Sequence, residues 1–172
     1  RLPGTKETVL NSTLEATSLR LQSLGISDLN EARCNHDQKS LSELIIQAVK
    51  EEAELILISG ASAVVDRRDV VPAAIEHAGG KIRHFGMPVD PGNLLLLGSI
   101  NGIDVVGIPG CARSPKLNGF DWVLQRLLAN IPVESVDIMR MGSGGLLKDI
   151  ISRPLPRAKA SQPDQNLIRT NP

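Results

Sequence analysis

Small residues and two carboxylates follow an apolar stretch at residues 55–59, and these are the groups best suited to chemistry in the chain. A continuous apolar run is typical of a strand inside a parallel sheet that is covered on both faces. Ligands of such sheets bind at the carboxyl ends of the strands. Small loop residues let backbone N–H groups approach an anion closely. We therefore expect a phosphate-binding loop made of Gly60, Ala61 and Ser62.

A second loop of the same kind, residues 109–115, follows another apolar run at residues 103–108. If the two runs are parallel strands, both loops open at one edge of the sheet, where the following helices add the positive ends of their dipoles. Arg113, Ser114 and Lys116 would add side-chain hydrogen bonds to an anion. Together the loops predict a phosphate cradle, whose second half is Pro109, Gly110, Cys111, Ala112, Arg113 and Ser114.

Asp66 and Asp69 could hold a divalent metal ion through their carboxylate oxygens. Phosphoryl and nucleotidyl transfer need such a cation to neutralise developing charge. Asp69 is also placed to cap the next helix, and the two roles are compatible. An ion pair with Arg67 is an equally good interpretation of Asp66. Cys111 has no base near it in the sequence, so it is not expected to be a nucleophile, and His84 is expected to be a core or rim histidine.

Helices alternate with apolar strands, which favours a three-layer α/β/α sandwich with a mostly parallel, mixed sheet. Asn101-Gly102, between two strands, predicts a hairpin. Such folds usually begin with a central strand, so we expect a further strand upstream of Arg1 or supplied by another segment. Helices are expected at 7–24, from a capping box at 40–43, at 70–78 and after the second loop, and strands at 55–59, 81–89, 94–100 and 103–108, with weak strand character at 26–34.

The chain has 172 residues, which suits one globular domain at 1–152. Residues 153–172 are rich in Pro, Ser, Gln and Lys and predict a linker or disordered tail. Lys+Arg and Asp+Glu both number 19, which argues against a nucleic-acid partner. No apolar run approaches the roughly 20 residues of a membrane span. With two cysteines and no secretory signal, a cytoplasmic protein with no membrane partner is expected.

At the two loops the sequence resembles the molybdopterin-binding domain family, which includes molybdenum insertase domains and their adenylylating relatives. The family pattern is a buried strand, a Gly-rich loop, an acidic residue, and an Asp with a nearby Pro that opens a helix. A strand with a Pro-Gly turn follows, and then a Pro-Gly loop after a hairpin strand. The matching segments are 59–62, Asp66 with 69–72, 85–93 and 109–115, and their order agrees over about residues 5–130.

The resemblance implies an α/β sandwich that often assembles into trimers or dimers. It also implies a small-molecule pterin ligand, molybdopterin or its molybdenum-loaded form, held by its phosphate, with Mg²⁺ and ATP where the relatives adenylylate. By the family pattern Asp69 would be the acid needed for catalysis, with Asp66 beside it, and Asp37 would join Asp69 at the metal. The implied ligand-binding residues are Gly60, Ala61 and Ser62, the middle turn Pro91, Gly92 and Asn93, and the second loop at 109–114.

The sequence departs from the family pattern at three places, and these departures favour binding over catalysis. Ala61 stands where a second Gly is usual, Asn93 replaces a basic residue, and residues 111–113 replace Asn-Pro. This variant looks closest to a subgroup fused to a nucleotidyltransferase, which would make that enzyme a fused or separate partner. Three functions stay open: molybdopterin binding in cofactor maturation, Mg-ATP-dependent adenylyl transfer or nucleotide pyrophosphate hydrolysis, and a scaffold that has lost the ligand.

Overall fold

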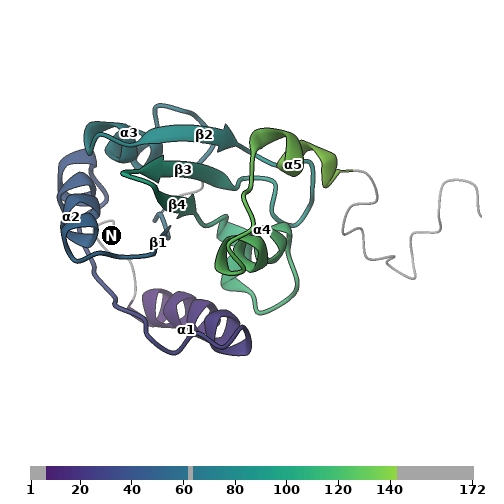
Figure 1. Ribbon diagram of the computed structural model, residues 1–172. Coiled ribbons are helices and arrows are strands. Elements are labelled where there is room, and N and C mark those ends of the chain that lie inside the picture. The colour runs from purple at the N-terminus through teal and green to yellow at the C-terminus, as the bar shows by residue number, and fades with distance from the viewer. Residues whose placement is uncertain (1–6, 62–63, 143–172) are drawn as a thin grey trace, which may run out of the picture.

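A four-stranded mixed sheet forms the centre of the molecule, which a computed structural model describes over residues 7–61 and 64–142 (Figure 1). The strand order is β1 (Leu55–Ile58), β4 (Ile103–Gly107), β3 (Leu96–Ile100) and β2 (Lys81–Phe85). β1 and β4 are parallel, whereas β4 with β3 and β3 with β2 are antiparallel. The expected mixed α/β sheet is therefore confirmed, although the described strands are less parallel than the sequence suggested.

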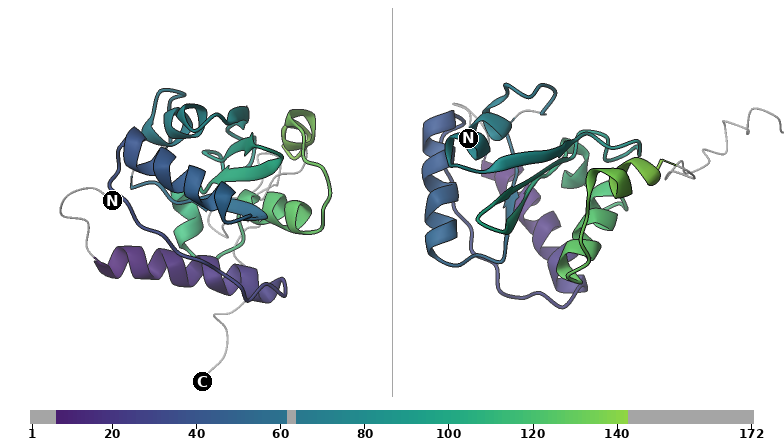
Figure 2. Two further views of the ribbon diagram at one scale, coloured as in Figure 1. Left: turned by 60° about the vertical axis from the view of Figure 1, so that its left-hand side comes forward. Right: turned by 45° about the horizontal axis from the view of Figure 1, so that its top comes forward.

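Helices lie on both faces of this sheet. On one face are α2 (Gln38–Lys50) and α3 (Val70–His77), and on the other are α1 (Glu7–Ser23), α4 (Gly119–Leu128) and α5 (Ser135–Arg140). The right-hand view in Figure 2 shows α1 next to α4, on the opposite side of the sheet from α2 and α3. This arrangement is the predicted three-layer sandwich. None of the described helices is long and apolar enough to cross a membrane.

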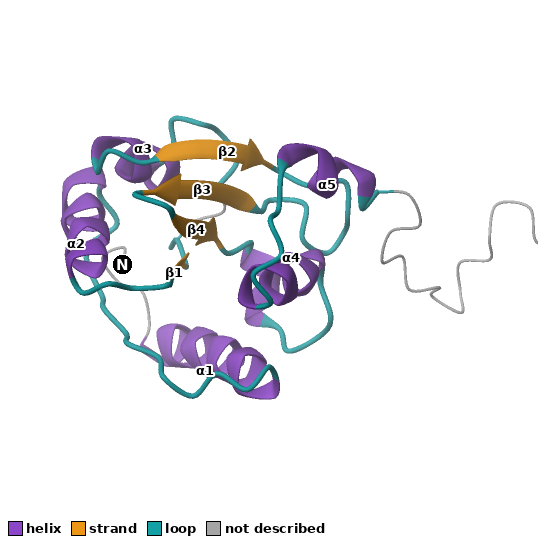
Figure 3. Cartoon of the chain, viewed as in Figure 1, coloured by secondary structure: helices purple, strands orange, loops and turns teal. Residues whose placement is uncertain are grey.

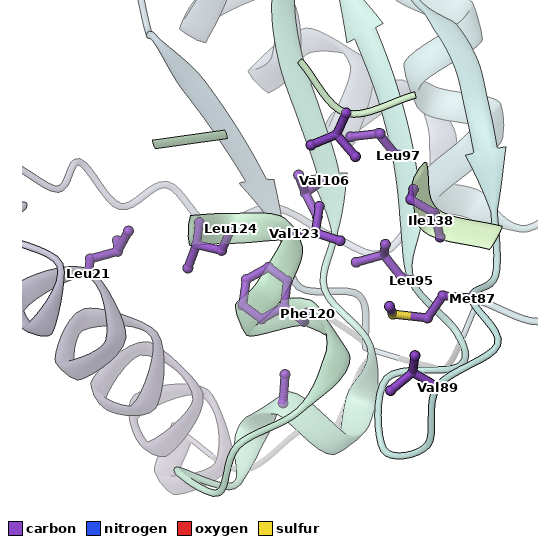
Figure 4. Close-up of a cluster of buried hydrophobic side chains, with 12 residues drawn as sticks. Leu21, Met87, Val89, Leu95, Leu97, Val106, Phe120, Val123, Leu124 and Ile138 are labelled. Atoms are coloured by element: carbon purple, nitrogen blue, oxygen red, sulfur yellow. The ribbon is translucent and has the colours of Figure 1, made fainter. Parts of the chain in front are cut away.

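Each face of the sheet buries its own apolar core. Neighbouring strand residues point to opposite faces, so Leu96 joins the core under α2 and α3, and Leu97 joins the core under α4 and α5. The second core is shown in Figure 4, where Leu21 of α1 approaches Leu124 of α4. Burial on both faces explains why strands such as β1 are wholly apolar. The buried members of the second core include Leu21, Met87, Val89, Leu95, Leu97, Val106, Phe120, Val123, Leu124 and Ile138.

The hairpin between β3 and β4 follows the prediction from Asn101-Gly102. The two residues have φ of 49° and 86°, as a tight hairpin turn with a right-handed strand twist requires. The extended segment expected at 81–89 is a strand only as far as Phe85. Gly86, with φ of 81°, turns the chain there.

Two local predictions are wrong. Residues 26–34 form no strand (Figure 3). Ile26 packs against the core, but residues 27–33 are all exposed, so they bury too little surface to hold an extended segment against the sheet. The helix predicted from the capping box at 40–43 begins earlier, because Asp37 is its N-cap and accepts a hydrogen bond from the Ser40 N–H at 2.8 Å. The expected tail at 153–172 and any strand upstream of Arg1 lie outside the described residues.

Candidate functional site

The two small-residue loops lie at the same edge of the sheet, as predicted. β1 and β4 pair in parallel from Leu55 opposite Asp104 to Ile58 opposite Gly107. The Ile108 N–H then donates to the Ile58 carbonyl at 2.9 Å, which carries the pairing to the start of the second loop. Parallel pairing therefore brings together two loops that are about 50 residues apart in the sequence.

A side chain of the second loop connects it directly to the first. The Arg113 Nη2 donates a hydrogen bond to the Gly60 carbonyl at 3.1 Å. Gly60 and Ala61 are partly buried, and Ser62 lies outside the described residues. The structure thus brings Arg113 to the first loop, while a role of these residues in ligand binding stays a prediction.

Within the second loop, side chains divide between the core and the surface. A short 3-10 helix, η1 (Gly110–Arg113), forms most of it. Ala112 is 2% exposed and belongs to the core, so its side chain is not available to a ligand. Cys111 and Arg113 are exposed, and a Cβ added at Gly110 would meet no atom of residues 7–61 and 64–142 within 4 Å. The open part of this loop is therefore the surface of Gly110, Cys111 and Arg113.

Arg20 of α1 holds the inner side of the second loop, and the sequence did not single it out. Its side chain is 9% exposed, and its guanidinium makes five hydrogen bonds. The acceptors are the Asp121 carboxylate, with Nε to Oδ1 at 2.6 Å, and the backbone carbonyls of Ala16, Ala112, Ser114 and Lys116. Thr13, Ala16 and Arg20 recur at helical spacing and are all buried on one side of α1, but this spacing does not reveal the partners of Arg20.

The turn at residues 90–93 packs against the first turn of α4. The Gly119 N–H donates to the Pro91 carbonyl at 2.8 Å. Gly92 has φ of 132°, and a Cβ there would lie only 2.9 Å from the Gly119 nitrogen. The packing against α4 therefore requires glycine at this position, whether or not a ligand binds. The buried Asn118 Nδ2 in turn contacts the Cys111 Sγ at 3.4 Å. Pro91 and Gly92 therefore have a structural role here, and ligand contact by the exposed Asn93 stays a prediction.

Asp69 stands at the N-cap position of α3, but its side chain does not cap that helix. Its Oδ2 instead accepts hydrogen bonds from the Val65 and Asp66 N–H groups, at 2.7 and 3.0 Å. These bonds, that of Asp66 first, hold the pKa of the Asp69 carboxyl below its usual value. The Asp66 Oδ1 accepts from the Arg68 N–H at 2.7 Å, in place of an ion pair with Arg67. Both carboxylates thus order the loop that follows residues 60–62.

His36 lies within electrostatic reach of both Asp37 and Asp69. Burial lowers the pKa of His36, and the two carboxylates oppose that effect. The Ser40 N–H lowers the pKa of Asp37, which is consistent with its capping role. In residues 7–61 and 64–142 we find no group of three or more His, Cys, Asp or Glu side chains placed to hold a metal ion. A metal site at Asp69 and Asp37 therefore stays a prediction.

Two shallow hollows lie away from these loops. One is between α2 and α3, where Ser42 Oγ donates to the Lys39 carbonyl at 2.9 Å and lies 3.1 Å from His77 Nδ1. The other lies between α1 and the segment after it, and is lined in part by Leu14 and Ile26. Neither hollow is lined by a predicted ligand-binding residue. These two hollows are therefore separate from the two loops.

His84 is a buried histidine at the rim of the core. The register of β2 against β3 shifts between Ile82 and His84, which places His84 opposite Leu97 on the α5 side. Its Nδ1 lies 2.7 Å from the Ser135 Oγ, and its buried Nε2 has no hydrogen-bond partner among the described residues. Burial, its largest influence, lowers the pKa of His84.

The lowered pKa of His84 predicts that the protein loses stability as the pH falls from about 7 to about 5. Because the folded-state pKa is below the unfolded value, the unfolded chain binds more protons in that range, so stability falls as pH falls. Urea midpoints measured at several pH values should fall less with falling pH in His84→Gln than in the wild type. Part of the pH dependence should remain, because the pKa of His36 is lowered as well. The exposed His77→Gln serves as control, and equal slopes in His84→Gln and wild type would contradict the assignment.

Of the comparisons with known proteins, only the one with solved structures finds a match. No family model matches the chain, and no curated protein matches it. Among solved structures 17 chains match. One is the molybdopterin biosynthesis MoeA protein from Pyrococcus horikosii, with a TM-score of 0.53 and 26% sequence identity. The match covers 70% of this chain, which spans only 28% of that protein. In fold and in sequence, the chain is therefore similar to one part of a molybdopterin biosynthesis protein.

Proposed function

We propose that this chain binds molybdopterin through its phosphate at the edge of the sheet where β1 and β4 end, and acts in molybdenum cofactor biosynthesis. One observation supports this most directly: parallel pairing places the loop beginning at Gly60 against residues 109–114, and Arg113 bridges the two. The similarity to part of a molybdopterin biosynthesis protein adds an independent reason for this ligand class.

The surface around the two loops is suited to an anion. Arg113 and Lys116 are exposed cations, and a Cβ at Gly110 would meet none of the described atoms within 4 Å. Since a guanidinium has five N–H donors, the bond to the Gly60 carbonyl is compatible with phosphate binding. The acidic side chains of this edge, Asp66 and Asp69, have oxygens engaged by backbone N–H groups, which reduces their repulsion of a phosphate. A phosphate can therefore approach from the Arg113 side.

Arg113→Ala is expected to weaken molybdopterin binding about tenfold or more, because it removes one charge-assisted contact and the bridge to Gly60. Binding is measured by fluorescence titration of the purified chain. Lys81→Ala is the matched control, since Lys81 is an exposed cation at the start of β2, at the opposite edge of the sheet. Absence of saturable binding by the wild-type chain would refute the proposal.

Adenylyl transfer is the second candidate function, and the state of Asp69 favours it. An aspartate is already ionised at neutral pH, and backbone hydrogen bonds lower the pKa of this carboxyl further, so it is suited to a cation rather than to proton donation. Wild-type protein is assayed for Mg-ATP-dependent adenylylation of molybdopterin, together with Asp69→Asn. Turnover that Asp69→Asn reduces by about 100-fold would establish the enzyme, and saturable binding without turnover would assign a binding protein.

A further inference from the structure

We infer that Arg20 is a positioning residue, which fixes the second loop in the conformation that ligand binding at the proposed site requires. The inference deepens the proposed function and rests on it for the ligand. Arg20 itself is buried under the loop and belongs to α1, far from residues 109–116 in the sequence.

The hydrogen bonds of Arg20 use the full capacity of a guanidinium. Its planar head has five N–H donors, and the structure gives them five acceptors. Three acceptors are carbonyls of the second loop and its continuation, at Ala112, Ser114 and Lys116. A lysine ammonium carries the same charge but cannot reproduce this fork of donors.

Besides Arg20, the second loop is held by the burial of Ala112, by the contact of Asn118 with Cys111 and by hydrogen bonds within its own short turn. η1 is a single 3-10 turn of four residues, and short 3-10 segments have poor hydrogen-bond geometry of their own. Arg113 is exposed and stands between Ala112 and Ser114, whose carbonyls both bind Arg20. Anchoring the backbone on both sides of Arg113 determines where its side chain can reach. The contact of Arg113 with Gly60 therefore depends on Arg20.

Arg20 acts by position and not by charge at the site. Its charge is neutralised by Asp121, and the two side chains are 9% and 12% exposed. Asp121 is fixed in turn by the Asn118 N–H, which donates to its Oδ2 at 2.8 Å. A buried, neutralised pair attracts a phosphate little at the surface, so an effect of Arg20 on binding must pass through the loop.

The test compares Arg20→Lys with Ile75→Val, a core change on the opposite face of the sheet. Amide hydrogen exchange of residues 110–117 and the molybdopterin Kd are measured for both, together with global stability. We expect Arg20→Lys to speed exchange in the loop about tenfold beyond any global effect and to raise the Kd about tenfold. Ile75→Val is expected to change neither once global stability is taken into account.

Unchanged loop exchange in Arg20→Lys would overturn the inference, and so would a loosened loop that binds with wild-type affinity. Failure of the wild-type chain to bind molybdopterin would refute the proposed function, while loop exchange would still decide whether Arg20 holds the loop. If Arg20→Lys does not fold, the wild-type protein gives the answer. The Arg20 Nε proton and the loop amides should then exchange through the same opening motion, with the same free energy of opening. Different free energies of opening would refute the inference.

Discussion

Asp121→Ala is expected to lower the free energy of unfolding by about 3–5 kcal/mol, because it leaves the Arg20 charge buried without its partner. Asp121 is buried, and its two oxygens have different partners. Oδ1 accepts from Arg20 Nε at 2.6 Å, and Oδ2 accepts from the Asn118 N–H in the capping box of α4. The variant therefore loses both an ion pair and a helix cap, which urea denaturation would measure.

Asp137→Ala is the matched control for this prediction. Asp137 has the same place in the capping box of α5, where its Oδ2 accepts from the Glu134 N–H at 2.9 Å, but none of the described arginines is bonded to it. Loss of a cap alone costs about 1 kcal/mol. An equal cost for the two variants would show that the buried ion pair contributes little. The double variant Arg20→Met with Asp121→Leu should recover part of the loss, because it removes both charges together.

Local patterns in the sequence predicted those parts of the fold and the site that depend on residues close to one another in the sequence. The apolar run of β1 is buried on both faces because the sheet is covered on both sides, and Asn101-Gly102 turns the hairpin as its residue types require. Parallel strands followed by loops then place the two loops at one edge. Each inference needed only a pattern a few residues long and one general rule of α/β topology.

The predictions that failed involve contacts that a local pattern does not contain. Residues 26–34 have apolar side chains, but whether they form a strand depends on pairing with a neighbour, which the described residues do not supply. Asp37 competes with Ser40 for the start of α2 and prevails through a hydrogen bond. Arg20 bonds to Asp121 across 101 residues. Long-range polar contacts of this kind leave no period in the sequence.

Phe120→Ala is expected to destabilise the protein by about 3–5 kcal/mol, since it removes a fully buried aromatic side chain. The chain has only two Phe residues, and Phe120 has 0% exposure at the centre of the core under α4 (Figure 4). Surrounding Leu and Val side chains are held by their own strands and helices, so they cannot collapse fully into the cavity. Denaturant midpoints of the two proteins would measure the loss.

Phe85→Ala is the control, because Phe85 is only partly buried, at the end of β2 and against the other core. Its cost should be clearly smaller, since part of its ring already contacts water. The Phe120 N–H also donates to Asn118 Oδ1, and the next residue, Asp121, makes the contact with Arg20. A cavity at Phe120 would therefore loosen the start of α4 and, through Arg20, the second loop. Equal costs for Phe120→Ala and Phe85→Ala would show that this core relaxes around the missing ring and does not support the loop.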